Sequence, residues 1–443
     1  MTKRTNKLIL NMNQTDFIRP KPYKRLFICF ALSITISFLC WIVHRSTMPA
    51  LSTQPDLFDA VWETVNEHFY DPNFNGVDWI TLKEQYRLRV AQASSRVEKA
   101  ALINEMLSEL KTSHTRLYTV DEPEYYQLLG IFYPRLPELR SQLQGTFPND
   151  RVEYAGIGIF TSEIEGKTFI KAILDGSPAV AGGLQVGDQI LSVADQPFHA
   201  IQSFASKVDQ PVILLVQKSA DPGSQQEVTV TPKLFDGITM FLDAMIDSLE
   251  VIEQSGKQIG YIHIWSYAGD QYQRKLEEEL IYGRLRDVDA LVLDLREGWG
   301  GAPPTALHLY TARGPSITNI GRDGTASTYH SQWEKPVVML VNENSRSAKE
   351  ILAYSFQHYD IGAVVGSPTS GSVVAGRPFL MPDDSLLYVA VADVYVDETV
   401  RLEGVGVIPD MVIPFPIAYA QGVDPQKEQA IATALVKTLR DDR

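Results

Sequence analysis

Two serines, Ser345 and Ser347, lie in NENSRSAKEILAYSFQ, a segment that begins as a polar loop and continues with a helical pattern. A serine hydroxyl acts as a nucleophile when a base takes its proton, another group orients that base, and N–H donors stabilise the oxyanion. Ser347 opens the predicted helix, whose N-terminus would stabilise developing negative charge. An ordinary N-cap serine would occupy the same position, so the other groups of a catalytic site must be sought elsewhere in the chain.

Three other stretches stand out for their residue types. DLREGWGG, at 294–301, is rich in glycine and follows a predicted strand. KTSHT contains His114, and a histidine with an ordinary pKa of about 6.5 is a competent base at neutral pH. LEGVGVIPD, at 402–410, contributes the carboxylate of Glu403. Taken singly, His114 would also serve as a cation at a helix C-terminus, and Glu403 as a surface charge in a turn.

An apolar segment near the N-terminus predicts where the rest of the chain lies. Residues 26–43, LFICFALSITISFLCWIV, carry no charge and are near the minimum length for a spanning helix. Seven Lys or Arg precede them against one acid, Asp16. This predicts a cytoplasmic basic segment over 1–25, a single-pass anchor of the inner or plasma membrane over 26–44, and a periplasmic or otherwise extracytoplasmic bulk. A cleaved signal peptide is the alternative, although no clear A-x-A site follows.

Helical periodicity predicts a small helical domain over residues 50–125. Its two clearest helices are expected at 57–70 and 97–111, and KTSHT marks the change toward strand. The apolar positions that repeat at helical spacing are Leu57, Val61, Val65, Phe69, Leu102, Met106 and Leu110.

Residues 240–443 alternate between predicted strands and helices. QIGYIHI, ALVLDLR, PVVMLVN and LLYVAVADVYV are expected strands of this part. Runs such as ALVLDL and VVMLV suit strands that are buried on both faces, which predicts an α/β core. Sites in such folds usually lie just beyond the strand ends, which is where DLREGWGG, NSRSAKE and LEGVGVIPD occur.

Between these parts, residues 152–235 contain short strand-like runs separated by glycine turns. GIGIF followed by SPAVAGGLQVGDQILSVADQ resembles a PDZ domain of the type found in exported proteases. The resemblance implies that a turn presents backbone N–H groups to the terminal carboxylate of a peptide, which adds as a strand to the sheet edge. The matching residues are Gly156, Ile157, Gly158 and Ile159. A structural β-domain without a ligand is the alternative.

In chain order, KTSHT, the PDZ-like unit, DLREGWGG, NSRSAKE and LEGVGVIPD resemble the C-terminal processing (tail-specific) serine peptidases and their tricorn-like relatives over residues 55–435. The resemblance implies an α/β, crotonase-like peptidase core that hydrolyses peptide bonds through an acyl-enzyme. In the family pattern Ser-Ala-x-Glu, it assigns the nucleophile to Ser347 and leaves Ser345 as a loop or capping residue.

The glycine-rich stretch resembles the oxyanion loop of the same family. The resemblance implies Gly300 and the Ala348 amide as oxyanion donors, with Gly301 as an alternative to Gly300. Glu297 and Gly298 stand where the family more often has small or amide residues, so the pocket is expected to differ there.

The sequence departs from the family pattern at the base. Many members carry a lysine 25 residues beyond the nucleophile, and SPTSGSVVAG has Ser372 at that position. Lys349 lies two residues along the predicted helix from Ser347, so it should point away from the hydroxyl. A Ser-Lys dyad is therefore not expected.

The tricorn-like branch pairs its serine with the histidine of a Ser-His motif and with a glutamate near a Gly-Val-x-Pro-Asp motif. Both motifs occur here. The resemblance to this branch therefore implies that His114 is the general base, and that Ser113 and Glu403 hold and polarise its ring. Asp397 and Glu398 are the nearest alternative carboxylates.

Composition argues against several other classes. Residues 51–443 carry 32 Lys or Arg against 53 Asp or Glu, which makes nucleic acid and anionic lipid poor partners. Both cysteines, Cys29 and Cys40, lie in the apolar segment, so no disulfide framework, thiol nucleophile or thiolate metal site is expected beyond it. The eight histidines are scattered, and no P-loop or dinucleotide motif occurs. We expect neither a metal nor a cofactor.

These observations predict a membrane-anchored, exported serine endopeptidase that acts on protein or peptide substrates, in particular unstructured C-terminal tails selected by the PDZ-like unit. A catalytically inactive pseudoprotease is the alternative, binding peptides in the PDZ groove or carrying apolar ligands, because the family lysine is absent. The sequence defines neither the substrate nor the oligomeric state.

Overall fold

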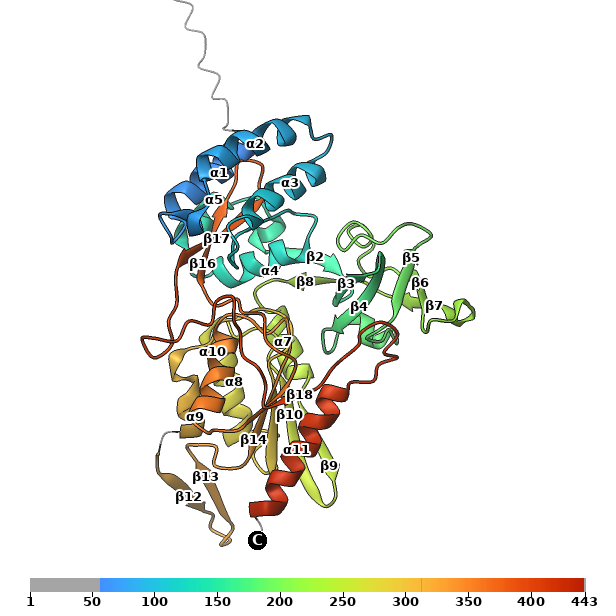
Figure 1. The fold of residues 1–443 in the computed structure, drawn as a ribbon. Helices are drawn as coiled ribbons and strands as arrows, with labels where there is room; N and C mark the ends of the chain where they lie inside the picture. Colours follow the sequence, from blue (N-terminus) through green and yellow to red (C-terminus); the bar gives the residue numbers. More distant parts are fainter. Residues whose placement is uncertain (1–55, 312, 442–443) are drawn as a thin grey trace, which may run out of the picture. The chain divides into compact units, whose positions relative to one another are not determined.

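The computed structural model describes residues 56–311 and 313–441 (Figure 1). The predicted cytoplasmic segment, 1–25, and the predicted anchor, 26–44, lie outside these residues. Among the helices of the described part, none is long and apolar enough to cross a membrane. The described part contains a helical region, a β-domain and an α/β core.

Three helices form the N-terminal region. The first and third correspond to the two predicted helices, and each ends earlier than predicted. The second has no clear apolar stripe in its sequence, and its buried side chains are Trp79, Tyr86 and Val90. Asp78 caps this helix by accepting a hydrogen bond from Thr81 N–H. The helices are α1 (Leu57–His68), α2 (Trp79–Gln92) and α3 (Arg96–Ser108).

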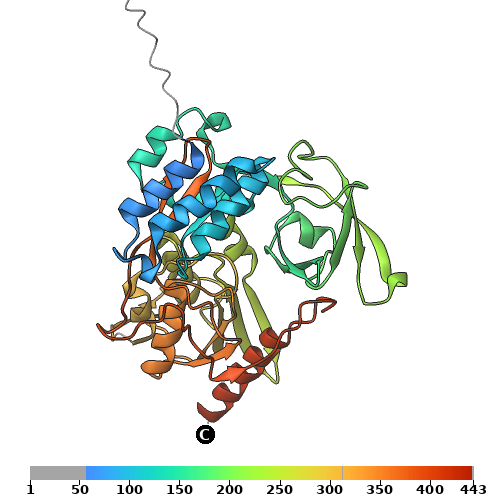
Figure 2. The same cartoon turned by 45° about the horizontal axis from the view of Figure 1, so that its top comes forward.

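A β-hairpin from the C-terminal half completes the core of this helical region. β17 (Leu386–Ala392) pairs antiparallel with β16 (Ala375–Leu380) and with β1 (Arg116–Tyr118). Leu387 and Val389 pack in the same hydrophobic cluster as the helices, and the hairpin lies beside the blue helices in both views (Figure 1, Figure 2). LLYVAVADVYV thus forms a strand, but assigning it to the α/β core was wrong, because it pairs in the separate sheet β1-β17-β16 and one of its apolar faces packs against α1–α3.

Two helices, α4 (Pro123–Phe132) and α5 (Pro137–Gln142), follow β1 and lead to the β-domain. This domain has a five-stranded antiparallel sheet of order β3-β4-β5-β6-β7. The run AGIGIF does not form one strand, because Gly158 has a φ of 81° and separates β2 from β3. The elements are β2 (Glu153–Gly156), β3 (Ile159–Ile164), β4 (Lys167–Ile173), α6 (Pro178–Ala181), β5 (Gln189–Val193), β6 (Val212–Gln217), β7 (Gln225–Val230) and β8 (Lys233–Asp236), which pairs with β2.

The α/β core is built on a six-stranded sheet of order β18-β15-β14-β11-β10-β9, in which all pairs except β10 with β9 are parallel. Every residue of β11 and β14 is buried, as their apolar runs predict. Side chains of α11 cover one face, and those of α7, α8 and α10 cover the other. The strands are β9 (Glu250–Gln254), β10 (Lys257–His263), β11 (Ala290–Asp294), β14 (Val337–Val341), β15 (Ala363–Gly366) and β18 (Met411–Val412). The helices are α7 (Met240–Asp247), α8 (Asp270–Ile281), α9 (His308–Thr311), α10 (Ala348–His358) and α11 (Pro425–Asp441), and β12 (Ser316–Ile320) pairs with β13 (Ala326–His330) in a separate hairpin.

The strand order brings three loops to one edge of this sheet. β10, β11 and β14 are adjacent and parallel, so the segments 264–269, 295–301 and 342–347 all leave the sheet at its carboxyl edge. This edge is the usual position of sites in α/β folds. The glycine-rich stretch and the Ser347 turn are therefore neighbours.

Candidate active site

Ser347 lies in a strained turn between a strand and a helix. β14 ends at Val341 and α10 begins at Ala348, and the backbone of Ser347 has φ 60° and ψ −135°. A residue other than glycine rarely adopts this conformation, and such strain persists only where neighbours enforce it. Here the Ser347 N–H donates to the Ser372 carbonyl at 2.8 Å and to Glu350 Oε1 at 3.2 Å. A strained strand-to-helix turn that presents a serine has the form of a nucleophile elbow.

Glu350, from the Ser-Ala-x-Glu pattern, is a buried carboxylate that holds the turn in place. Its Oε2 accepts hydrogen bonds from Thr369 Oγ1 at 2.6 Å and Gly371 N at 2.7 Å, and its Oε1 accepts one from Ser372 N at 2.7 Å. Burial raises the pKa of Glu350. Ser372, which replaces the family lysine, therefore supports the Ser347 backbone through its main chain.

Ser345 has a different environment from Ser347. It is fully buried, donates from Oγ to the Leu295 carbonyl at 2.9 Å, and accepts from Asn342 N at 3.0 Å. These bonds join the Ser347 turn to the end of β11. Ser345 is a structural residue, in agreement with the expectation from the sequence.

A chain of hydrogen bonds joins Glu403, Ser113 and His114. Ser113 Oγ lies 2.9 Å from Glu403 Oε2 and 2.8 Å from His114 Nδ1. Glu403 is buried and also accepts from the main chain, from Ser113 N at 2.7 Å and from Val373 N at 2.6 Å. An ionised carboxylate can only accept, so the Ser113 hydroxyl donates to Glu403 and must accept from His114 Nδ1–H. This assigns the lone pair of the His114 ring to Nε2, the atom that a general base uses.

The surroundings of His114 keep its ring neutral. Burial lowers the pKa of His114 to about 4, the positive charge of Arg346 lowers it as well, and the charge of Glu403 opposes the shift. A neutral imidazole has the free lone pair that a base needs. His114 therefore has the protonation state of a base at neutral pH.

Ser347 and His114 line the same cleft, which has a volume of about 630 Å³. Gly300 and Gly301 line it too. No hydrogen bond of the described residues joins Ser347 Oγ to His114. The two residues share a cleft, and they would have to come within hydrogen-bond distance to transfer a proton.

Gly300 contacts the Ser347 turn directly. A β-carbon at Gly300 would lie 2.4 Å from Ser347 Cβ, so no other residue fits. Gly301 instead faces the segment after β10, because a β-carbon there would lie 2.6 Å from Ala268 Cα. Within the described part, the N–H groups of Gly300 and Ala348 donate no hydrogen bond. These two amides are free to bind an oxyanion, as the sequence suggests.

Lys349 points into the protein interior and not toward Ser347. Its Nζ donates to the Glu297 carbonyl at 2.8 Å and to the Trp265 carbonyl at 3.1 Å. The side chain is fully buried, and burial lowers the pKa of Lys349 to about 7. Lys349 therefore binds the backbone of the glycine-rich loop from the protein interior, a role that the sequence does not reveal.

Arg346 holds the same loop from the cleft side. Its Nε donates to the Gly298 carbonyl at 3.0 Å, and its guanidinium lies 4.0 Å from the centre of the Trp299 ring. Trp299 Nε1 in turn donates to Gln127 Oε1 at 2.8 Å. Sequence reasoning missed Arg346, although its position next to the candidate nucleophile was an available signal.

Glu297 links the glycine-rich loop to two other segments. It forms an ion pair with Lys171 of β4 at 3.3 Å and accepts hydrogen bonds from Asn342 Nδ2 and Asn344 Nδ2, both at 2.9 Å. Glu297, which differs from the residue usual in the family, thus connects the β-domain to the segment that precedes Ser347.

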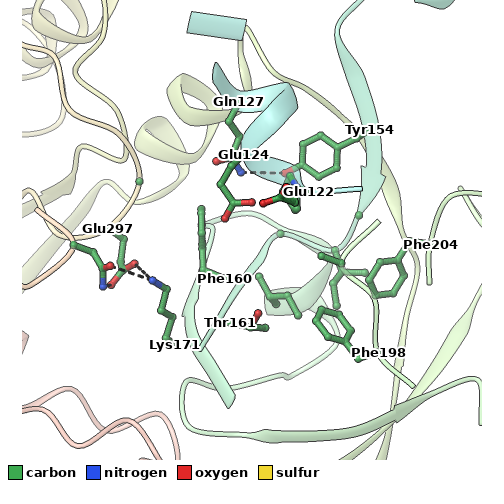
Figure 3. Close-up of a pocket in the computed structure, with 18 of the residues that line it drawn as sticks. Glu122, Glu124, Gln127, Tyr154, Phe160, Thr161, Lys171, Phe198, Phe204 and Glu297 are labelled. Carbon is green, nitrogen blue, oxygen red and sulfur yellow. Dashed lines mark hydrogen bonds and ion pairs between the residues drawn. The ribbon is translucent and has the colours of Figure 1, made fainter. Parts of the chain in front are cut away.

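A second cavity, of about 210 Å³, lies between the β-domain and these loops (Figure 3). All four predicted peptide-binding residues line it, with Phe198 and Phe204 on the β-domain side and Gly298 and Arg346 on the other. The N–H groups of Ile157 and Gly158 donate no hydrogen bond within residues 56–311 and 313–441. Figure 3 also shows the Lys171–Glu297 pair at its edge. The four predicted residues are Gly156, Ile157, Gly158 and Ile159.

In the part of the chain that the structure describes, no group of three or more His, Cys, Asp or Glu side chains is arranged to hold a metal ion. The residues of the cleft suit acyl transfer through a serine, a histidine and backbone donors.

Known families match three parts of the chain. Residues 258–413 match Peptidase family S41, residues 54–108 match the Tricorn protease C1 domain, and residues 169–218 match the PDZ domain. The first match contains Gly300, Ser347 and Glu403, whereas His114 lies outside all three.

Individual proteins are similar over most of this chain. A protein of Synechocystis sp. named Carboxyl-terminal-processing protease is 27% identical over 418 residues, which cover 91% of this chain and 92% of that protein. Putative tricorn protease homolog 2 of Streptomyces coelicolor is 26% identical over 403 residues, which cover 85% of this chain and 32% of the relative. A crystal structure of the tricorn protease shares the fold with a TM-score of 0.51 at 20% identity, over 87% of this chain and 36% of that chain.

Proposed function

We propose that this chain, a serine-type peptidase that belongs to peptidase family S41 and carries a PDZ domain, cleaves peptide bonds by forming an acyl-enzyme on Ser347. The observation that supports the base is the hydrogen-bond chain from Glu403 through Ser113 to His114. It leaves Nε2 of His114 free in the cleft that contains Ser347. A histidine base also explains how this chain could catalyse the reaction although Ser372 stands in place of the family lysine.

In the acylation step, Ser347 Oγ attacks the substrate carbonyl carbon while its proton passes to His114 Nε2. The carbonyl π electrons move to oxygen, and the N–H groups of Gly300 and Ala348 stabilise the resulting oxyanion. Ser113, backed by Glu403, holds the imidazolium through Nδ1–H. His114 then returns the proton to the leaving amine as the C–N bond breaks.

In the deacylation step, the same groups act in reverse. His114 takes a proton from a water molecule, whose oxygen attacks the acyl carbon. The C–O bond to Ser347 breaks, and the serine recovers its proton from His114. The products are a new carboxylate and the free enzyme.

The PDZ domain would select the substrate by its C-terminal tail. The free N–H groups of Ile157 and Gly158 suit a terminal carboxylate, and Phe198 and Phe204 suit an apolar last side chain. Because Arg346 lines both this cavity and the cleft, a bound tail would contact a residue that holds the oxyanion loop.

We also propose that residues 26–44 anchor the enzyme in the cell membrane, with the basic segment 1–25 in the cytoplasm and the peptidase outside. The charge-free run and the seven preceding Lys or Arg support this orientation. Extraction of membranes at alkaline pH, and protease accessibility of the PDZ domain in spheroplasts, test it. Release of the intact chain by carbonate would contradict an anchor.

A covalent probe tests the catalytic assignment. A peptidyl phosphonate should label Ser347 in the wild type, detected by mass spectrometry of the digested protein, and labelling should fail in His114→Ala. His199→Ala is the matched control, since His199 is exposed on the PDZ domain and lines no part of the cleft. A wild type that stays unlabelled but binds tail peptides would instead support a non-catalytic binding protein.

A further inference from the structure

The cleft that contains Ser347 and His114 also carries two arginines that the proposed mechanism does not use, Arg135 and Arg274. Arg135 follows α4, and Arg274 lies in the second turn of α8, so they come from separate parts of the chain. Both side chains are exposed. Within residues 56–311 and 313–441, neither guanidinium forms an ion pair or a hydrogen bond.

The charged residues of this cleft are mostly positive, although the protein as a whole is acidic. The chain has a formal net charge of −14, whereas the lining of the cleft has three arginines against one acid, Asp270. The third arginine, Arg346, is already bound to the Gly298 carbonyl. A concave surface with charges of one sign concentrates its potential on a ligand inside, so the cleft favours a negatively charged group.

Arg135 lies next to the segment that contacts the oxyanion loop. A β-carbon at Gly269 would lie 2.7 Å from Arg135 Nη2, so the guanidinium is close to this glycine, whose φ of 135° other residues rarely adopt. Gly269 ends the segment after β10. Two residues earlier, Tyr267 N donates to the Gly300 carbonyl at 3.1 Å. One short segment therefore contacts both the oxyanion loop and Arg135.

The cleft also has apolar lining residues, namely Leu128, Ile131, Phe132, Val374 and Tyr388. The lining therefore suits a substrate that carries both apolar side chains and a carboxylate. Guanidinium groups suit that carboxylate because they donate two parallel hydrogen bonds to it.

We propose that Arg135 and Arg274 are specificity-determining residues that bind a carboxylate of the peptide substrate near the scissile bond. The inference rests on the proposed function, in which this cleft holds the substrate. The carboxylate comes either from an Asp or Glu side chain or from the C-terminus of a tail that is cut close to its end. The two sources have the same chemistry, and one set of peptides separates them.

The test uses the full-length enzyme and four quenched fluorescent decapeptides of one leucine- and alanine-rich sequence. They contain either Asp or Asn at the same position, and end in either a free carboxylate or an amide. The kcat/KM for each peptide is measured with the wild type and with Arg135→Gln/Arg274→Gln. Arg140→Gln is the matched control, because Arg140 is an exposed arginine of α5 outside the cleft.

The wild type should prefer one carboxylate-bearing peptide over its neutral counterpart, on the order of ten-fold. This ratio should fall to about one in the double variant and stay unchanged in Arg140→Gln. A preference for Asp over Asn would identify a side-chain carboxylate as the ligand. A preference for the free C-terminus over the amide would identify the terminal carboxylate. A wild-type ratio of one in both arms, or a preference that survives in the double variant, would overturn the proposal.

Binding to Ser347→Ala separates this inference from the proposed function. The same peptides, without quencher, are titrated by fluorescence anisotropy against Ser347→Ala and against Ser347→Ala/Arg135→Gln/Arg274→Gln. If the wild type cuts no peptide but Ser347→Ala binds carboxylate peptides in an arginine-dependent way, the proposed catalysis fails and the carboxylate site stands. Cleavage without any carboxylate preference leaves the catalysis intact and rejects the site.

Discussion

The hydroxyl of Ser113 lies 2.9 Å from Glu403 Oε2, and the two residues are 290 positions apart in the chain. Because the carboxylate can only accept, this contact decides the direction of the next hydrogen bond, from His114 Nδ1–H to Ser113 Oγ. The relationship thus determines which nitrogen of His114 is available to Ser347.

Ser113 and Glu403 should act on catalysis as one unit. Ser113→Ala or Glu403→Gln removes the group that orients the His114 ring, so each should lower kcat by about 10²-fold with little change in KM. The double variant should be no worse than the worse single variant, because either change already breaks the chain of bonds. Steady-state kinetics on one peptide measure this, with the exposed Ser108→Ala as control. Losses that multiply would show that the two residues act independently.

The acid limb of the pH profile should lie well below the ordinary pKa of histidine. Burial lowers the pKa of His114 to about 4, so the base stays unprotonated through the mildly acidic range. For an uncharged peptide, kcat/KM should begin to fall only as the pH approaches 4. An acid limb centred near 6.5 would contradict the buried environment of the ring.

The same shift has a defined sign for stability. The unfolded chain takes up the His114 proton near the ordinary value of about 6.5, before the folded chain does. Above that pH the ring is neutral in both states, and the free energy of unfolding is not reduced by His114. As the pH falls toward 4, only the unfolded chain is protonated at this residue, so the free energy of unfolding decreases. The melting temperature of His114→Gln should accordingly decrease less than that of the wild type between pH 6.5 and 4.

Arg346 should influence catalysis through both its charge and its shape. Arg346→Gln removes the charge that lowers the pKa of His114 and the bond to Gly298, so the acid limb should move to higher pH and kcat should fall. Arg346→Lys keeps the charge but loses the planar stacking on Trp299, so the acid limb should stay in place while kcat falls about ten-fold. Identical pH profiles for the wild type and Arg346→Gln would show that the charge does not reach His114.

The strain at Ser347 should be measurable in inactive variants. Glycine adopts a φ of 60° without a Cβ clash, so Ser347→Gly should be more stable to urea than Ser347→Ala by about 1–2 kcal/mol. Glu84→Gly and Glu84→Ala are the control pair, because Glu84 is exposed in the helix α2. There the glycine variant should be the less stable one, by about 1 kcal/mol, since glycine disfavours a helix relative to alanine. Equal stability of the two Ser347 variants would mean that the turn relaxes without cost.

Local sequence patterns predict much of the fold, and the errors of that prediction have a common cause. Runs such as ALVLD and VVMLV indicated strands buried on both faces, which the structure confirms. LLYVAVADVYV was also recognised as a strand, but its partners are β1 and β16, and one of its apolar faces is covered by α1–α3. Periodicity reports that a face is apolar and does not report which element covers it.

The candidate site divides in the same way. The sequence by itself located the serine that opens a helix, the glycines after β11 and the Gly-Ile-Gly-Ile turn, because turn and cap chemistry act over a few neighbouring positions. Their expected roles came from the resemblance to the peptidase family. The resemblance implied that Ser113 and Glu403 act together on His114, and the structure supplies the contact between them. Only the tertiary structure decided that Lys349 and Arg346 hold the glycine-rich loop, and that Arg135 and Arg274 share the cleft with Ser347. These contacts depend on the order of strands in the sheet and on how separate segments pack, and no local spacing encodes them.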